Sequence, residues 1–321
     1  MALIDNRALG EPGVVCPACG GALAPWRTVP AAEPGLEGRY QLLRCTVCGT
    51  AVTVGGPSDH DLHETGAYRP GQPRLYRLAR PLLDLFDRQR LALLRSLIEP
   101  PARLLDVGAG RGRFVAAAGA AGYEASGIEP SLRGWGAASA RGVGVRQASI
   151  EDAPFAEDSF DAVTAWHVLE HLDDPGAALT RVSSWLRPGG VLLVGAPNLA
   201  SAQARVAAGR WYHLDAPRHR VHFTPGGLEA LLRAHGFTPV RTVHALLEHN
   251  PFGMWQSLVN RVTRDPSYLY NLLKRNAPLR SPDLLITVAA LPLAPFAAFA
   301  ELVAALARRG GTIAVLARRV A

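Results

Sequence analysis

The 321-residue chain has few charged residues and, among its basic residues, almost no lysine. Only 19% of the residues are charged and 48% are hydrophobic, which excludes a disordered chain and allows a sizeable core; the length allows about two domains. Lys274 is the single lysine among 34 basic residues, a skew typical of a GC-rich genome rather than of phosphate binding. A net charge of +7 still permits an anionic partner, such as nucleic acid, an anionic lipid or a phosphorylated substrate.

A secretory leader is also missing, and cysteine is scarce. Residues 1–13 have neither a basic start nor an apolar stretch, so we expect a cytoplasmic protein. The four cysteines form two C-x-x-C pairs, and in an intracellular protein this spacing favours a metal over disulfides. The expected ligands are Cys16, Cys19, Cys45 and Cys48. Four thiolates leave no open position for a substrate, so we predict a structural zinc ribbon over 14–52.

A redox dithiol or a chance repeat is the alternative to the ribbon. The role of a ribbon, in docking, as a lid or as a scaffold, stays open.

Residues 53–100 are expected to form a linker and an N-terminal cap helix. Gly, Pro, Asp and His crowd 55–73, which indicates a linker, although 65–68 could fold over a cofactor. Apolar residues recur at helical spacing over 74–98, and Pro100-Pro101 ends that helix.

Strand and helix patterns alternate from residue 101 onwards, which predicts an α/β domain over 101–321 with a doubly wound, mostly parallel sheet of seven strands. We expect strands at 102–107, 123–128, 143–146, 160–165, 190–195, 239–245 and 312–318. We expect helices near 112–121, 131–140, 175–186 and 225–235. Asp174-Pro175 provides an N-cap followed by proline at the first helical position.

The first of these strands runs into a glycine-rich turn, Leu104-Leu105-Asp106-Val107-Gly108-Ala109-Gly110-Arg111-Gly112-Arg113-Phe114. Alternate glycines let the backbone turn tightly and approach a ligand, as at the nucleotide sites of doubly wound domains. Arg113 breaks the dinucleotide pattern G-x-G-x-x-G. A tight turn without a ligand is the simpler alternative. Glu129, at the end of the next strand, could accept hydrogen bonds from both hydroxyls of a ribose.

These two segments and the motifs that follow resemble class I S-adenosylmethionine-dependent methyltransferases, of the type 11 and type 23 kinds. The resemblance covers about 103–245, in the order and at the spacing of that family. It continues through Ser149–Phe155, Asp158–Asp161, His167–His171, Leu186–Gly190, Ala196–Asn198, His219–Thr224 and His235–Phe237. It implies a Rossmann-like methyltransferase sheet with S-adenosylmethionine as cofactor.

The resemblance also implies which residues hold the cofactor. Gly108, Gly110 and Gly112 would lie against its methionine part, and Asp106 would pair with its ammonium group, directly or through water. Glu129 would bind the ribose. Ile150, Glu151 and Asp152 would meet the adenine, with an ordinary solvated loop as the alternative for Asp152. Trp166 lies where the fourth strand ends, at the mouth of the sheet, and is a further cofactor contact.

Three residues after that strand could carry chemistry. His167, Glu170 and His171 are spaced i, i+3 and i+4, so on one helical turn they would share a face. His167 or His171 could act as a general base for a hydroxyl or amine acceptor. The trio could instead bind a metal, with His219 or His222, or Glu170 and His171 could only brace the helix against the sheet.

A second polar cluster, in a loop that commonly covers the acceptor in this family, contains His213, Asp215, Arg218, His219 and His222. We interpret this cluster as an acceptor pocket or local hydrogen bonding. His219-x-x-His222 could be half of a zinc site, but no matching pair is evident.

The segment 246–310 is an insertion before the last strand. Residues 284–300 carry no charge, which is long enough to consider a membrane span, but Pro292 and Pro295 would interrupt it. A single span would also separate the last strand from its sheet. We therefore expect either buried or dimer-forming helices, or peripheral membrane contact through 281–309 with Arg308 and Arg309 at the interface.

These features favour methyl transfer to a small-molecule or lipid-linked acceptor, with a hydroxyl as the expected group. No Asn/Asp-Pro-Pro-aromatic motif follows the fourth strand and no Pro-Cys nucleophile is present, which argues against methylation of adenine, glutamine or cytosine C5. An RNA methyltransferase that docks RNA through the ribbon is one alternative, and a non-enzymatic scaffold is another. The acceptor and the oligomeric state stay open.

Overall fold

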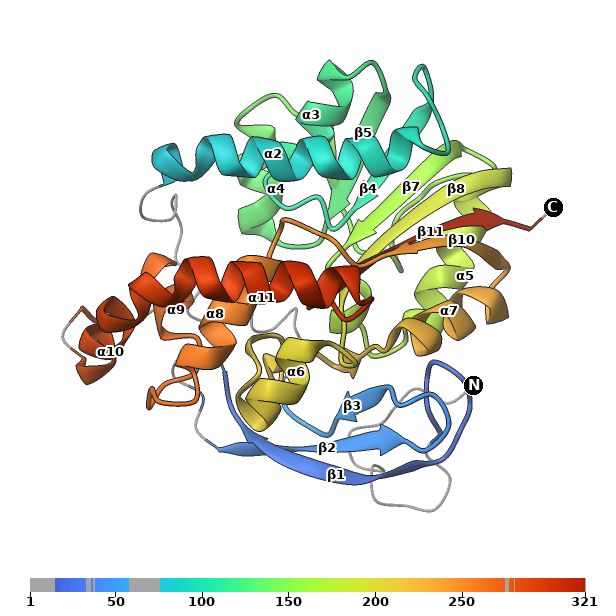
Figure 1. Ribbon diagram of the computed structural model, residues 1–321. Coiled ribbons are helices and arrows are strands. Elements are labelled where there is room, and N and C mark those ends of the chain that lie inside the picture. Colours follow the sequence, from blue (N-terminus) through green and yellow to red (C-terminus); the bar gives the residue numbers. More distant parts are fainter. Residues whose placement is uncertain are drawn as a thin grey trace.

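The computed structural model describes residues 15–32, 36, 38–57, 76–274, 277–279 and 281–320. Its centre is a seven-stranded sheet in the order β10-β11-β8-β7-β4-β5-β6 (Figure 1). The strands are β4 (Arg103–Val107), β5 (Glu124–Glu129), β6 (Val145–Gln147), β7 (Phe160–Trp166), β8 (Leu186–Pro197), β10 (Phe237–Val243) and β11 (Thr312–Arg319). Neighbouring strands from β6 to β8 are parallel, whereas β11 runs antiparallel to both β8 and β10. The predicted mostly parallel, seven-stranded sheet is confirmed.

Helices cover both faces of this sheet, because successive residues of a strand point to opposite sides. Leu104 of β4 packs with α2 (Tyr76–Arg95) and α3 (Arg113–Ala120), whereas Leu105 packs on the side of α5 (Pro175–Trp185) and α7 (Pro225–Ala234). A further helix, α4 (Leu132–Ser139), joins α3 and β6 in a smaller cluster. The Asp174 side chain accepts a hydrogen bond from the Ala177 N–H at 2.9 Å, as expected of an N-cap. Because the strands are apolar on both faces, helices cover the sheet on both sides, which is the doubly wound arrangement.

The strand order reverses beside β4, since β5 and β6 extend the sheet on one side and β7 and β8 on the other. The carboxyl ends of β4 and β7 meet at this switch point, where doubly wound folds bind ligands. The glycine turn follows β4, and Trp166 and His167 follow β7. The fold therefore brings the predicted cofactor turn and the predicted catalytic histidines to the same edge of the sheet.

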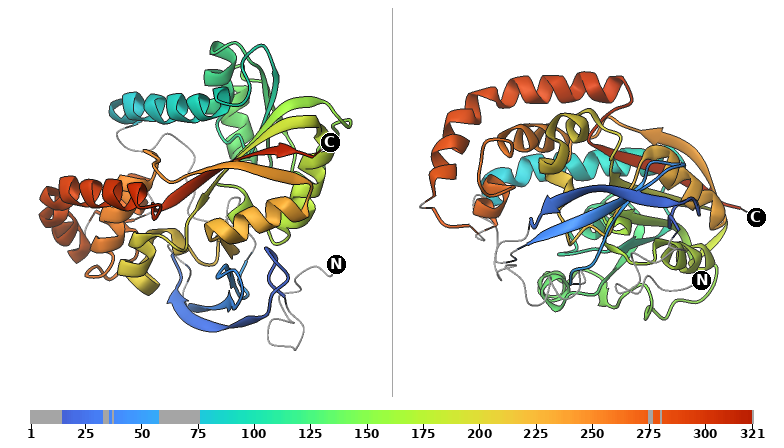
Figure 2. Two further views of the ribbon diagram at one scale, coloured as in Figure 1. Left: turned by 45° about the vertical axis from the view of Figure 1, so that its right-hand side comes forward. Right: turned by 90° about the horizontal axis from the view of Figure 1, so that it is seen from below.

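A second, antiparallel sheet has the order β1-β2-β3-β9. It consists of β1 (Leu23–Pro30), β2 (Arg39–Cys45), β3 (Ala51–Thr53) and β9 (Val221–His222). Figures 1 and 2 show its first three strands, in blue, beneath the larger sheet. The fourth strand comes from the loop after β8 and pairs Ala51 with His222 and Val52 with Val221. The cysteine-containing segment is therefore joined to the larger unit by main-chain hydrogen bonds, which the sequence did not predict.

The insertion before β11 is helical, as expected. It contains α8 (Asn250–Val259), α9 (Tyr268–Leu273), α10 (Pro282–Ala290), a 3-10 turn η4 (Leu291–Leu293) and α11 (Ala294–Leu306). Pro292 and Pro295 do not stop the helical chain but lie in the first turns of η4 and α11. Figure 2 shows a sharp bend between α10 and α11.

The same helical stretch, Pro282–Leu306, is the only one in the described part of the chain that is long and apolar enough to cross a membrane. Only 17% of its most apolar window is buried. The expectation of helices buried within the chain is therefore wrong for their outer face. Only the inner face packs, where Ala297 meets Met254, Trp255 and Val259 of α8.

Candidate functional site

The turn between β4 and α3 needs each of its three glycines. The φ angles of Gly108, Gly110 and Gly112 are +69°, +53° and +72°, which side chains rarely allow. A Cβ atom at Gly108 would lie 2.6 Å from a methyl of Val168, and one at Gly112 would lie 2.9 Å from a methyl of Val143. A Cβ at Gly110 would meet no atom within 4 Å. The middle glycine therefore exposes backbone to an open space that a ligand can approach.

Glu129 reaches this turn from the end of β5. Its Oε2 accepts a hydrogen bond from the Gly110 N–H at 2.8 Å, and its Oε1 accepts one from the Ser131 N–H at 3.0 Å. Gly134 makes room for it, because a Cβ there would lie 2.8 Å from the Glu129 Cγ. Each carboxylate oxygen has a second lone pair. The carboxylate is therefore held beside the turn by backbone N–H groups on both of its oxygens.

Asp106 has a partner that the sequence did not predict. Its Oδ1 accepts hydrogen bonds from the Arg90 guanidinium of α2 and, at 2.6 Å, from the Thr164 hydroxyl. Both charged side chains are buried. The Arg90 guanidinium also lies 3.6 Å from the centre of the Phe114 ring. Direct pairing of Asp106 with a ligand ammonium group would therefore have to share the carboxylate with Arg90.

A second set of charges links α2 to the segment before α8. Arg113 donates a hydrogen bond to Asp87 at 2.6 Å and lies 3.8 Å from Glu248. Burial raises the pKa of Asp87 to about 6, despite the opposing effect of Arg113 and Arg90. Burial alone would raise the pKa of Glu248, but His249, His167 and the two arginines lower it. The roles of Arg90 and Glu248 could not be predicted from local sequence patterns, because their partners are distant in the chain.

Trp166 belongs to this set through its indole. Its Nε1–H donates to Glu248 at 2.9 Å, and its ring packs on Gly195, where a Cβ atom would lie 2.6 Å from the ring.

The segment predicted to contact the adenine follows β6. Ile150 is buried, whereas Glu151 and Asp152 are exposed, and Asp152 accepts a hydrogen bond from the Ser149 hydroxyl at 2.9 Å. These residues occupy the same edge of the sheet as the glycine turn.

Three imidazoles gather beyond the end of β7, and we refer to His167, His213 and His249 as the three-histidine cluster. Ring centres lie 5.0 Å apart for His167 and His249, 6.4 Å for His167 and His213, and 6.0 Å for His213 and His249. Burial lowers the pKa of His213 well below its ordinary value and that of His249 to about 4. At neutral pH His213 and His249 are therefore uncharged bases.

Two members of this cluster have unusual backbone. The φ angle is +56° at His167 and +62° at His249, a left-handed conformation that costs energy in residues with a Cβ. His167 Nδ1 lies 2.8 Å from the Glu170 carboxylate, so this nitrogen donates its proton and Nε2 carries the lone pair in the neutral ring. Such strained, carboxylate-oriented histidines are typical of active sites.

His167 and His171 do not share a helical face, so that prediction is wrong. His167 precedes the short 3-10 turn η1 (Leu169–His171), and its left-handed backbone turns it away. The centre of the His171 ring instead lies 4.7 Å from that of His219. Glu170 contacts His167 and also lies near the His171 and His219 pair. Ligand atoms of Glu170, His171 and His219 all lie within 4.8 Å of one another. His219, rather than His167, completes the trio for which a metal was considered.

The cysteine-containing segment holds the loop after β8 through side-chain hydrogen bonds. The Thr53 hydroxyl donates to the His219 carbonyl oxygen at 2.7 Å and lies 2.9 Å from His222 Nε2. The Thr224 hydroxyl donates to the Cys48 carbonyl oxygen at 2.8 Å. His222 is therefore used in a structural contact, and within the described residues it is not part of a group of converging metal ligands.

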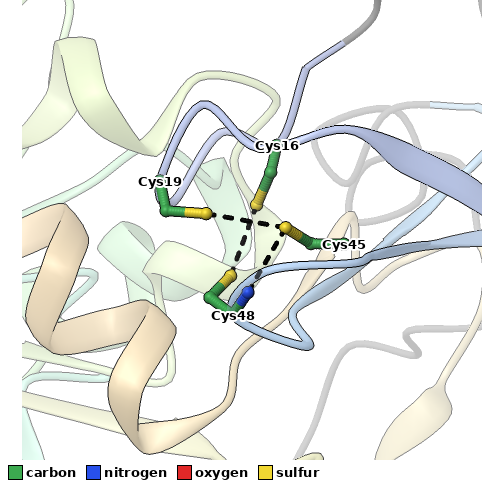
Figure 3. A group of neighbouring side chains, drawn as sticks. All are labelled: Cys16, Cys19, Cys45 and Cys48. Atoms are coloured by element: carbon green, nitrogen blue, oxygen red, sulfur yellow. Dashed lines mark hydrogen bonds between the residues drawn. The ribbon is translucent and has the colours of Figure 1, made fainter.

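The four cysteines converge as predicted (Figure 3). Sulfur atoms of Cys16 and Cys48 lie 3.7 Å apart, and those of Cys19 and Cys45 lie 3.5 Å apart. Thiolates at ~2.3 Å from a tetrahedral zinc ion would lie about 3.8 Å apart. The Cys45 sulfur accepts from the backbone N–H groups of Val47 at 3.4 Å and of Cys48 at 3.5 Å. Burial would raise the pKa of Cys45, but these N–H groups and the neighbouring thiols of Cys19 and Cys48 lower it to about 7.

Comparison with known proteins identifies families and relatives to which this chain is similar. A family model described as a methyltransferase domain matches residues 74–242. The chain is 29% identical over 189 residues to a ubiquinone biosynthesis O-methyltransferase of Rhodopseudomonas palustris (strain HaA2), covering 55% of this chain and 72% of that protein. It is 37% identical over 115 residues to the protein of the same name from Xanthomonas campestris pv. campestris (strain B100), covering 34% of this chain and 48% of the relative.

Among solved structures, the chain is similar to the (4+2)-cyclase SpnF. The TM-score is 0.51 at 19% identity, with 83% of this chain and 97% of that chain covered. At this identity the likeness concerns the fold alone, and a cyclase on the same fold illustrates that the fold does not determine the reaction.

Proposed function

Because this chain belongs to the family of methyltransferase domains, we propose that it transfers the methyl group of S-adenosylmethionine to a hydroxyl group of a small molecule. The names of the curated relatives support a hydroxyl acceptor, although the match leaves up to about half of those relatives uncovered. The observation that carries the proposal is the hydrogen bond between Glu129 and the Gly110 N–H at the switch point of the sheet. This contact supports a ribose-binding role for Glu129, because it holds the carboxylate beside the middle glycine of the turn, where a Cβ atom would meet open space.

In this proposal the cofactor supplies an electrophilic methyl group, and the chain positions it. Glu129 binds the ribose hydroxyls, and Gly108, Gly110 and Gly112 border the methionine part. Ile150, Glu151 and Asp152 border the adenine, and Trp166 closes the mouth of the site. Asp106 acts through Arg90 and Thr164, which fix its carboxylate behind the turn.

His167 is the proposed general base. Glu170 orients its ring through Nδ1 at 2.8 Å, which leaves Nε2 to accept the proton of the acceptor hydroxyl. His171 is the second candidate, and its contact with the His219 ring favours a role in building the acceptor wall or in binding a metal. A His167→Gln variant should retain cofactor binding and lose about 100-fold or more in methyl transfer once an acceptor is known. Unchanged turnover would assign the base elsewhere.

The cofactor part of the proposal is tested by titrating the protein with S-adenosylmethionine in a calorimeter. Wild type should bind, and Glu129→Ala should bind about tenfold or more weakly, because it loses two hydrogen bonds to the ribose. Glu124→Ala is the matched control, since Glu124 is exposed at the opposite end of the same strand. A wild-type protein that releases no heat and shows no binding would leave only the non-enzymatic scaffold.

An RNA acceptor is the second candidate, and one observation favours it. On the ribbon sheet, the Arg27 and Arg44 guanidiniums lie 3.7 Å and 5.1 Å from the centre of the Trp26 ring. Aromatic side chains beside arginine are a common combination in proteins that bind single-stranded nucleic acid. RNA binding that weakens with salt and is lost in Trp26→Ala would support this candidate. No binding at low salt would remove it.

The ribbon itself is proposed to hold one structural zinc ion through Cys16, Cys19, Cys45 and Cys48. The converging sulfur atoms and the N–H groups directed at Cys45 support this assignment. Metal analysis of the purified protein should give about one zinc per chain, and Cys45→Ser should lose it. A folded wild-type protein without metal would refute it.

A further inference from the structure

The outer face of α10 and α11 is an exposed apolar surface that contains none of the proposed cofactor-binding residues. Large side chains along it are highly exposed: Phe296 is 73% exposed, Phe299 68%, Leu285 75% and Leu306 73%. Leu291 and Leu302, about half exposed, continue the same surface. A monomeric soluble protein rarely exposes so many large apolar side chains on one element. We refer to this face as the apolar ridge.

The acidic residues of this region are turned away from the ridge. Glu301 is buried and accepts hydrogen bonds from Gln203 at 3.0 Å and from the Gly311 N–H at 2.6 Å. Asp283 is fully buried and accepts from the backbone N–H groups of Arg264 and Asp265. The face that points outward is therefore free of negative charge over its whole length.

Exposed positive charge borders the ridge. Arg308 and Arg309 are exposed and follow the end of α11, and the exposed Arg264 lies beside the start of α10, where its backbone N–H donates to Asp283. In the described part of 261–309, Asp265 is the only exposed acidic residue. An apolar strip flanked by arginine is the pattern of a helix that lies in the interface of a membrane containing anionic lipid.

The bend between α10 and α11 decides between lying on a membrane and crossing it. The 13 residues of α11 extend over about 20 Å, which is shorter than the ~30 Å hydrocarbon core of a bilayer. Figure 2 shows that α10 leaves in a different direction, so the two helices are not one straight rod. The inner face of α11 is moreover fixed on α8 through Ala297.

We propose that the apolar ridge docks this protein on the surface of an anionic phospholipid bilayer, with Phe296 and Phe299 inserted and Arg308 and Arg309 at the headgroups. The helix that bears the ridge is connected to the proposed acceptor site through one packed helix, because α11 packs on α8, and α8 begins directly after His249 of the three-histidine cluster. A membrane-dissolved acceptor would then have a short path to the site. Docking itself does not depend on the proposed methyl transfer.

Vesicle flotation with the full chain tests this proposal. The protein should float with vesicles of phosphatidylcholine and phosphatidylglycerol and bind less to phosphatidylcholine alone. Phe296→Ser combined with Phe299→Ser should weaken the partition about tenfold or more, and Arg308→Gln combined with Arg309→Gln should weaken it only on anionic vesicles. Val47→Ser combined with Val240→Ser is the control, since those side chains are 76% and 51% exposed on other elements.

Unchanged thermal unfolding and unchanged S-adenosylmethionine binding establish that the variants are folded. Absence of vesicle binding, or binding that the two serines do not change, overturns the proposal. Dimerisation that the serines abolish, without vesicle binding, identifies a second copy of the chain as the occupant. Resistance to alkaline carbonate extraction identifies a membrane span instead. None of these outcomes affects the cofactor titration, so the two proposals fail separately.

Discussion

The hydroxyl of Thr53 donates a hydrogen bond to the carbonyl oxygen of His219 at 2.7 Å, and both residues are buried. This contact joins the cysteine-containing segment to the loop after β8. It continues through β3 and β9 and through the contact between Thr224 and the Cys48 carbonyl. The ribbon is therefore tied to the loop that carries His219 and His222 rather than being an appended module.

Thr53→Val should destabilise the protein by about 1–3 kcal/mol, because it removes a buried hydroxyl that donates to the His219 carbonyl oxygen and accepts from His222 Nε2–H. Chemical denaturation measures the change in the free energy of unfolding. Thr46→Val is the matched control, since the exposed Thr46 hydroxyl makes only a long contact of 3.3 Å. Equal effects of the two substitutions would contradict the structural role of Thr53.

Removal of metal from the ribbon should loosen the loop at 219–224. Without an ion nothing bonds the four cysteine sulfurs together, and β3 loses the support that holds β9. Hydrogen exchange should become faster at Val221 and His222 after chelation and change little at 104–107 of β4. Loss of protection in β4 of the same size would indicate global unfolding instead.

Arg90→Met should cost about 3–5 kcal/mol of stability, because it leaves the Asp106 carboxylate buried without its ion-pair partner. Arg88→Met is the control, since Arg88 is exposed on the same helix. Arg90→Met combined with Asp106→Asn should recover part of the loss, because no charge then remains buried. A double variant no more stable than Arg90→Met would show that packing of Arg90 on Phe114 is the larger effect.

Acid should destabilise the fold. Burial lowers the pKa of His222 to about 3 and of His249 to about 4, from the ordinary value of 6.5, and lowers those of His213 and His219 well below it. The unfolded chain therefore binds more protons below about pH 6.5, so the free energy of unfolding falls as the pH falls through that range, by up to about 1.4 kcal/mol per pH unit for each histidine.

Two buried acids have the opposite effect on the free energy of unfolding. Burial raises the pKa of Asp87 to about 6 and that of Glu301 to about 7, so the folded chain binds more protons than the unfolded chain between about pH 4 and 7. Their contribution to the free energy of unfolding therefore decreases as the pH rises through that range. Four histidines outweigh two acids, and urea unfolding at about pH 5 should give a lower free energy than at about pH 7. His249→Asn should flatten this dependence, because asparagine tolerates the left-handed backbone at this position. A pH-independent free energy would contradict the burial of neutral histidines.

Apolar periodicity was sufficient to predict the sheet. β4 and β7 lie within one residue of their predicted bounds, because apolar runs between glycines and acids specify buried parallel strands. The strand β9 could not be predicted, since two residues carry no periodic pattern. The pairing of His171 with His219 and of Arg90 with Asp106 depends on tertiary packing, which no local spacing records.

The insertion illustrates another limit of sequence reasoning. A run without charge predicts an apolar helix whether it is covered by protein, lipid or nothing. The exposure of Phe296 and Phe299 follows from the position of α11 on one side of α8, which composition does not specify. The converging cysteines, by contrast, were predictable because the metal chemistry is encoded in their spacing.

The pairing of β3 with β9 also has a consequence for biosynthesis. Thr53 and His222 are 169 residues apart, so the outer edge of β3 has no native partner while the ribosome makes the intervening chain. During that interval an unpaired strand edge is open to other chains. The ribbon emerges first but completes its sheet only after the strands through β8 have left the ribosome, so an N-terminal fragment that ends before residue 221 lacks the strand that closes it.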